Sequence, residues 1–147
     1  MNKAIFNRYA RFDYEILESF EAGIVLQGDE IKAIRSGRAN LKGSYAKIFY
    51  TSGKPEIFLV GAHFHTLTLD PYRTRKLLVH ANEIKHLVGK SAEKRLTLVP
   101  LKLYLKRGRA KVEIGVGRGK KEFDKRETIK KRDLDRAAMQ ELAGRGK

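Results

Sequence analysis

The strongest constraint on the fold is a period-two pattern in residues 96–117, LTLVPLKLYLKRGRAKVEIGVG. Leucines alternate with other residues from Leu101 to Leu105, and apolar residues again occupy every other position in the second half. This alternation predicts two strands that each bury one face. The Lys-Arg-Gly-Arg segment between them predicts a hairpin turn with Gly108 in the special backbone position. Pro100 predicts a bulge or an edge in the first strand.

Most apolar segments before residue 96 are short and also predict strands. YEILESF alternates loosely, and AGIVL predicts a buried strand that opens with a turn at Ala22-Gly23. SYAKIFY and EIFLV predict a second hairpin across the turn TSGKP, and KLLVH predicts a further strand.

Two segments predict helix instead. GDEIKAIRSG predicts one or two helical turns, with Asp29 as a possible cap and Gly37 as a stop. Asn82 predicts the start of a longer helix, because the apolar residues Ile84 and Leu87 recur on one face behind it.

These elements predict a mainly β fold with short helices, built as a single OB-like antiparallel β-barrel, because strands and helices do not alternate. We expect a basic arm dotted with aromatic residues at 1–12, the barrel at 13–117 and a basic tail at 118–147. The tail has too few large apolar residues to bury a core, so we expect it to be disordered in the free protein. Its four-residue spacing of Leu134, Ala138 and Leu142 allows it to become helical against a partner.

Charge and composition narrow the classes of function. The 147 residues carry a formal charge of +15, which favours a polyanionic partner: nucleic acid first, an anionic membrane surface second. No apolar stretch approaches the roughly 20 residues that a bilayer requires, and the start MNKAIFNRYARF lacks the apolar segment of a secretory signal. We therefore expect a soluble, cytoplasmic protein. The absence of cysteine excludes disulfides, zinc ribbons and thiol chemistry.

The sequence contains no identifiable enzyme site. Gly119-Lys120 is followed by Lys121 where a Walker loop needs Ser or Thr, and its spacing to Gly115 is one residue short. The alternating glycines do not match the dinucleotide fingerprint, and they fit the end of a strand with one bare face. His63 and His65 share a face of a probable strand but lack a third ligand at matching spacing. We expect no catalysis, no cofactor and no metal.

Three segments suit RNA, each with a simpler alternative. In GKKEFDKRE, Phe123 is a lone aromatic among cations and suits base stacking, whereas the alternative is a solvated charged tail. In DPYRTRKLL, Arg73 and Arg75 can share a face and contact phosphates, whereas the alternative is an exposed basic loop. Glu30 can pair weakly with a neighbouring cation, fix an arginine or accept from a guanine edge.

The chain closely resembles the SmpB (SsrA-binding protein) family over nearly its whole length. The resemblance is carried by NRYARFDYEI, FEAGIVLQGDEIKAIRSGRANLKGSYAKI, RTRKLLVHANEI, TLVPLKLYLKRGRAKVEIGVGRGKK and FDKRETIKKRD. It implies an OB-like barrel and a non-enzymatic partner of transfer-messenger RNA in trans-translation. The segment GAHFHTLTLDPYR is shorter than is usual in the family.

The resemblance also implies roles for two groups of residues. A surface of arm and barrel faces the tRNA-like domain, and the tail enters the decoding site and empty mRNA channel of a stalled ribosome, where it becomes helical. With the basic residues near Arg73 added, the first group is Asn7, Arg8, Arg11, Gly28, Glu30, Lys32, Arg35, Arg73, Arg75 and Lys76. The tail group is Lys120, Lys121, Phe123, Asp124, Lys125, Arg126, Lys130, Lys131 and Arg132. We expect a monomer when free; the alternative function is a general OB-fold RNA binder or ribosome-associated protein.

Overall fold

The computed structural model describes residues 4–93, 96–120 and 125–145, with side chains for 4–93, 96–120 and 130–144. In this part of the chain the fold is mainly β, as predicted. The elements in chain order are β1 (Ile5–Phe6), α1 (Ala10–Asp13), β2 (Tyr14–Ile24), α2 (Gly28–Arg35), β3 (Ala39–Asn40), β4 (Tyr45–Thr51), β5 (Lys54–Val60), β6 (His63–Phe64), β7 (Arg75–Leu78), α3 (Ala81–Ser91), β8 (Leu96–Lys106), β9 (Arg109–Gly119) and α4 (Lys125–Arg145).

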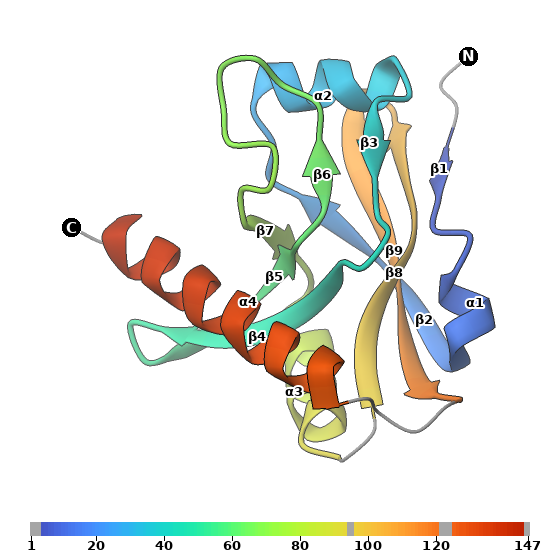
Figure 1. Cartoon of the computed structure of the whole chain (residues 1–147), viewed down its shortest axis with the longest axis vertical. Coiled ribbons are helices and arrows are strands. Elements are labelled where there is room, and N and C mark those ends of the chain that lie inside the picture. Colours follow the sequence, from blue (N-terminus) through green and yellow to red (C-terminus); the bar gives the residue numbers. More distant parts are fainter. Residues whose placement is uncertain (1–3, 94–95, 121–124, 146–147) are drawn as a thin grey trace.

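Seven strands form one sheet in the order β1-β8-β4-β5-β7-β2-β9, and β8 also pairs with β9. The antiparallel pairings therefore lead from β8 through β4, β5, β7, β2 and β9 back to β8. The link between β4 and β8 is the thinnest, with Ala46 opposite Leu98 as its registered pair. Figure 1 shows α2 at one end of these strands, α3 at the other and α4 crossing in front of β4.

The predicted hairpin at 96–117 is confirmed and is the longest in the structure. Arg107 and Gly108 form its turn with φ of 53° and 76°, the left-handed pair that a tight hairpin requires. The register shifts between Pro100 and Lys102, which is the predicted bulge. The inward alternation places Leu103 and Val112 opposite each other with no exposed surface.

The alternating glycines at the end of this hairpin let β2 lie close to β9. A Cβ on Gly115 would lie 3.0 Å from Ile16 Cγ2, and one on Gly117 would lie 2.9 Å from Tyr14 Cβ. The bare strand face predicted from the sequence is therefore covered by β2 side chains. β9 continues to Gly119, past the predicted boundary at 117.

The predicted turn at Ala22-Gly23 is wrong, because β2 is one strand that runs through both residues. Gly23 pairs with Lys111 of β9 on one side and with Leu78 of β7 on the other. A Cβ on Gly23 would lie 3.4 Å from Leu78 Cβ, an ordinary van der Waals contact, so the space beside β7 does not require glycine here.

The second predicted hairpin, β4 with β5, is confirmed, but its proline lies inside a strand. Ser52 and Gly53 make the turn with φ of 53° and 79°. Pro55 lies in β5 opposite Tyr50. β5 is buried on both faces, with Ile57 facing the main core and Phe58 facing a second apolar cluster.

Both predicted barrel helices form, but each begins earlier than its predicted cap. Gln27 caps α2 through a capping box with Glu30, so Asp29 is not the cap. His80 precedes α3 where Asn82 was predicted. The predicted apolar face of α3 is correct, since Leu87 has no exposed surface and lies in the main core.

The tail differs most from its prediction. Residues 125–145 form α4, which packs within the chain itself. The residues at the predicted four-residue spacing, Leu134, Ala138 and Leu142, make this contact. They cover the second cluster, whose barrel side is Tyr45, Phe49, Phe58 and Val60. The sequence of the tail did not predict that α4 docks on the barrel, because β4 and β5 supply most of the apolar surface in this contact.

Candidate nucleic-acid interface

Glu30 is the centre of a buried ion cluster at the start of α2. Its side chain has no exposed surface. Its carboxylate accepts from the Gln27 amide at 2.9 Å, Arg75 Nε at 2.7 Å and Arg73 Nη2 at 2.5 Å. Burial raises the pKa of Glu30, but these donors outweigh burial and hold the pKa below its ordinary value. Glu30 thus fixes two arginines. That Glu30 fixes an arginine was one of the three hypotheses that the sequence left open.

Arg75 is buried as completely as Glu30 and ties several segments together. Besides Glu30, it donates to the carbonyls of Ala62 at 2.8 Å and Pro71 at 3.1 Å. Its guanidinium lies 4.1 Å from the ring centre of Phe64. Burial lowers the pKa of Arg75, and the charge of Glu30 opposes this shift. Through these buried hydrogen bonds, Arg75 connects the loop at residues 61–73 to Glu30 of α2.

The cluster corrects the predicted surface at two positions. Glu30 and Arg75 present no side chain to solvent, so they position their neighbours. Arg73 also reaches Glu30, and its side chain is 18% exposed. Their spacing predicted a shared face for phosphate contact; in the structure Arg73 and Arg75 share Glu30 as an internal partner instead. Lys76 points outward and pairs with Glu56 at 2.9 Å.

The exposed cations of α2 lie on the surface above this cluster. Lys32 and Arg35 are exposed on the helix, and Gly28 is exposed in its first turn. Glu30 is the residue of the same helix that anchors it from below. The helix α2 thus has two faces: a buried face, where Glu30 pairs with arginines, and an exposed face that carries Lys32 and Arg35.

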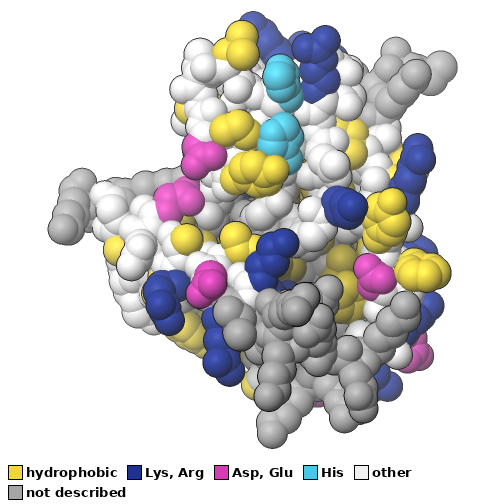
Figure 2. Space-filling model, in the orientation of Figure 1, with side chains coloured by type: hydrophobic (Ala, Val, Ile, Leu, Met, Phe, Trp, Pro, Cys, Tyr) yellow, Lys and Arg dark blue, Asp and Glu magenta, His cyan; other side chains and the backbone are white. Residues whose placement is uncertain are grey.

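A hollow beside α2 was not predicted. His63 and His65 line it together with Gly37, Arg38, Ala39 and Asn40. The ring of His63 also meets Tyr72 edge-on at 4.9 Å. The predicted shared face of the two histidines is therefore confirmed, and Figure 2 shows histidines gathered at one end of this face beside Lys and Arg side chains. The missed residue Arg38 directly follows Gly37, whose positive φ of 73° ends α2.

Residues 4–12 of the N-terminal arm lie against β8, with which β1 pairs. Asn7 donates through its side chain to the Pro100 carbonyl at 3.0 Å, and its amide donates to the Leu101 carbonyl at 2.9 Å. Asn7 therefore anchors the arm, whereas Arg8 and Arg11 are exposed.

The arm also exposes three aromatic rings. The rings are Phe6 at 64%, Tyr9 at 53% and Phe12 at 67% exposure. Lys42 lies 5.3 Å from the ring centre of Tyr9. Exposed rings interleaved with cations suit stacking on unpaired bases.

The tail residues fall into three groups. Lys120 is tied to the arm, since its Nζ donates to the Arg11 carbonyl at 2.8 Å. Lys121, Phe123 and Asp124 lie outside the described residues, as do the side chains of Lys125 and Arg126. In α4, Lys130 and Arg132 are exposed, whereas Lys131 reaches inward to Thr97 at 3.4 Å.

The described residues contain neither a group of three potential metal ligands nor a helix long and apolar enough to cross a membrane.

The family model of the SmpB protein matches residues 4–144. The chain belongs to the SmpB family. Curated relatives are SsrA-binding proteins: the one from Acaryochloris marina is 53% identical over 95% of this chain and 92% of the relative. The one from Syntrophobacter fumaroxidans is 52% identical over 88% of this chain and 82% of the relative.

A solved structure gives the same result. It is described as "tmRNA-SmpB: a journey to the center of the bacterial ribosome". One of its chains is 43% identical, matches with a TM-score of 0.66, and aligns over 92% of this chain and 94% of its own length. The resemblance that the sequence motifs carry is thus confirmed.

Proposed function

We propose that this chain is an RNA-binding adaptor of trans-translation. It binds the tRNA-like domain of transfer-messenger RNA and delivers it to stalled ribosomes. The observation that carries this proposal is the family match over residues 4–144. The SsrA-binding relatives and the solved tmRNA-SmpB structure support both partners. The formal charge of +15 supports a polyanionic ligand.

The proposed architecture is an OB-like barrel at 13–117, an arm at 1–12 and a tail at 118–147. Strand pairings that lead from β8 back to β8 support the barrel. The chain acts in the cytoplasm as a monomer when free and works by binding, without catalysing a reaction. The sparse, dispersed histidines and acids support this non-enzymatic role.

The proposed RNA face combines the outer side of α2 with the arm. Lys32, Arg35, Arg8 and Arg11 supply exposed positive charge to phosphates. Asn7 acts on RNA indirectly by holding the arm on β8. Gly28, Glu30, Arg73 and Arg75 shape the base of α2, and Lys76 adds charge at the edge.

The tail is the proposed ribosome-binding part. Its cations and the Phe123-Asp124 pair enter the decoding site and the mRNA channel. This division predicts separable roles. Phe123→Ala combined with Asp124→Ala abolishes rescue of stalled ribosomes but changes RNA affinity by less than about tenfold, or about 1.4 kcal/mol. A larger loss would assign the tail to the RNA face.

A binding titration across salt concentrations tests the RNA proposal. The full chain is titrated with the tRNA-like domain and with an RNA duplex of equal length. Phosphate contacts alone give the same steep salt slope for both RNAs. We expect a preference for the tRNA-like domain that persists at high salt. Equal affinities would favour the alternative, a general RNA-binding or ribosome-associated protein.

Matched variants locate the preference. Lys32→Gln with Arg35→Gln removes two exposed charges from α2. Lys54→Gln with Arg107→Gln removes two exposed charges from the hairpin turns. We expect only the α2 pair to reduce the preference. Equal losses from both pairs would mean that affinity follows net charge and that α2 has no special role.

A further inference from the structure

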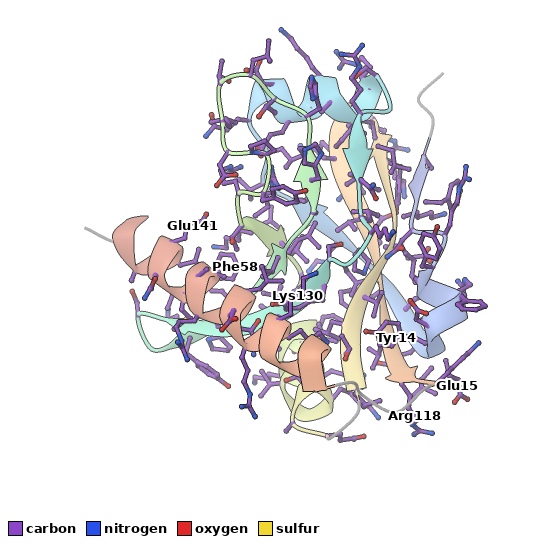
Figure 3. The ribbon with its side chains drawn as sticks, viewed as in Figure 1. Tyr14, Glu15, Phe58, Arg118, Lys130 and Glu141 are labelled. Atoms are coloured by element: carbon purple, nitrogen blue, oxygen red, sulfur yellow. The ribbon has the colours of Figure 1, made fainter. Side chains whose placement is uncertain are left out.

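The C-terminal helix α4 touches the barrel along a narrow stripe. Leu134, Ala138 and Leu142 recur every four residues and face the β4–β5 cluster. Ala138 is 2% exposed. Figure 3 shows labelled Phe58 beside this helix, with Glu141 on the same helix. An apolar contact this narrow offsets only part of the entropy lost on ordering a long, charged helix.

Polar contacts at two points hold the helix in this position. At the first, Asp135 accepts from the Tyr45 hydroxyl and from Lys47 Nζ. Lys47 remains 45% exposed and Asp135 21% exposed. Burial and the neighbouring carboxylate raise the pKa of Tyr45, so the phenol stays protonated and can donate.

The second contact point is Glu141, which lies further along α4 than Asp135. The carboxylate of Glu141 accepts from the Thr74 amide, at 3.1 Å for its nearer oxygen. Thr74 lies between Arg73 and Arg75, the two arginines that bind Glu30. The helix is therefore attached to the same segment that anchors α2.

A hollow borders the described part of the helix. A hollow of about 220 Å³ lies between α4, β4, α3 and β8, with Lys131 and Asp135 on its helix side. Over its described side chains, 130–144, the helix thus combines an apolar stripe, two polar attachments and a bordering hollow, which together suit a reversible contact.

We propose that docked α4 is a stowed conformation of the C-terminal segment, latched by Asp135 and Glu141, that must be released before the segment engages a partner away from the barrel. This rests on the proposed function of the tail. A helix whose apolar stripe covers β4–β5 cannot at the same time lie in the mRNA channel. The apparent affinity of the tail for the ribosome is then reduced by the fraction of chains in which α4 is released.

Variants on the barrel side test the latch without changing the tail sequence. Tyr45→Phe removes one donor to Asp135, and Lys47→Gln removes the ion pair. Lys54→Gln is the matched control, since Lys54 is an exposed cation of the same hairpin. Ala138→Glu, which places a carboxylate in the packed stripe, gives the fully released reference.

The first readout is the distance between two spin labels in the full chain without RNA. The chain has no cysteine, so Lys85→Cys on α3 and Gln140→Cys on α4 provide the only attachment points. We expect one narrow distance distribution for the parent and for Lys54→Gln. Tyr45→Phe and Lys47→Gln should each raise the long-distance population about two- to tenfold. A parent distribution as broad as that of Ala138→Glu would overturn the proposal.

The second readout is affinity for vacant ribosomes. Tyr45→Phe should bind more tightly than the parent, by the same factor as its released population increases. Lys47→Gln should bind more tightly than Lys54→Gln, which carries the same net charge. Unchanged or weaker binding despite more release would overturn the competition between docking and tail use. If the proposed function itself fails, the parent and all variants bind ribosomes poorly while the distances still change.

Discussion

The β8–β9 hairpin and α4 are both long elements near the C-terminus. The sequence pattern of the hairpin itself decides which of its residues are buried, whereas in α4 a contact with distant strands decides it. In the hairpin, alternation along the strands already separates the buried face from the exposed face. In α4, most residues are polar, and the side chains that the structure describes, 130–144, bury a single stripe against a cluster that includes three aromatic residues of β4 and β5. An element that carries its own pattern contributes to the cooperative core. An element that packs on apolar side chains supplied mainly by other strands can detach from them without unfolding the core.

The largest expected effect tests whether the barrel side of this comparison depends on charge as well as on packing. Glu30→Gln leaves Arg75 buried without its counter-charge, so we expect a loss of about 3–5 kcal/mol in the free energy of unfolding. Urea titration measures it, with Glu15→Gln, an exposed acid on β2, as the control. A loss no larger than that of the control would mean that the ion cluster does not stabilise the barrel.

The same variant has a defined pH dependence. The pKa of Glu30 is lowered in the folded chain. Its contribution is therefore fully present above the unfolded value of about 4.3 and is lost as the pH falls through the folded value. The stability difference between parent and Glu30→Gln should shrink in acid. A difference that stays constant down to about pH 2 would contradict this assignment.

Leucine truncations in the two regions test the comparison directly. Leu103→Ala opens a cavity in the main core and should cost about 2–5 kcal/mol in the free energy of unfolding. Leu142→Ala should cost less than about 1 kcal/mol globally, because it weakens a local contact. Hydrogen exchange should nevertheless show that α4 amides lose protection in Leu142→Ala. Equal global costs would mean that α4 and the barrel unfold as one unit.

A glycine pair sharpens the barrel side. Gly117→Ala places a Cβ 2.9 Å from Tyr14 Cβ, so β2 and β9 must move apart. We expect a loss of about 1–3 kcal/mol in the free energy of unfolding. Gly89→Ala in α3 meets open space and should instead stabilise by about 0.5–1 kcal/mol. Thermal unfolding of both variants checks the opposite signs.

The smallest expected effect concerns the exposed pair Lys76–Glu56, which belongs to neither region's core. Its side chains are 46% and 29% exposed, so solvent screens it. Lys76→Gln should change the free energy of unfolding by less than about 1 kcal/mol. A double-mutant cycle with Glu56→Gln isolates the pair. A coupling above this range would show that surface charge contributes to the barrel more than packing suggests.

The residues of the candidate site also fall into two groups, those predictable from the local sequence and those that depend on tertiary contacts. Exposed cations such as Lys32 and Arg35 were predictable, because charge on an amphipathic helix faces solvent. The burial of Glu30 and Arg75 was not, since it depends on the loop at 61–73 folding back over α2. The hollow that includes Arg38 was missed for the same reason, because its walls come from β3 and β6.

The sequence by itself determined the strand pattern, the hairpin turn at Gly108, the overall positive charge and the family. These follow from local periodicity, backbone freedom and composition, which need no knowledge of distant partners. Only the tertiary structure decided that β2 runs straight through Gly23, that Arg75 lies inside, and that Leu134, Ala138 and Leu142 find a surface to cover. In each case the deciding contact joins residues far apart in the chain, and the burial of one partner depends on where the other lies.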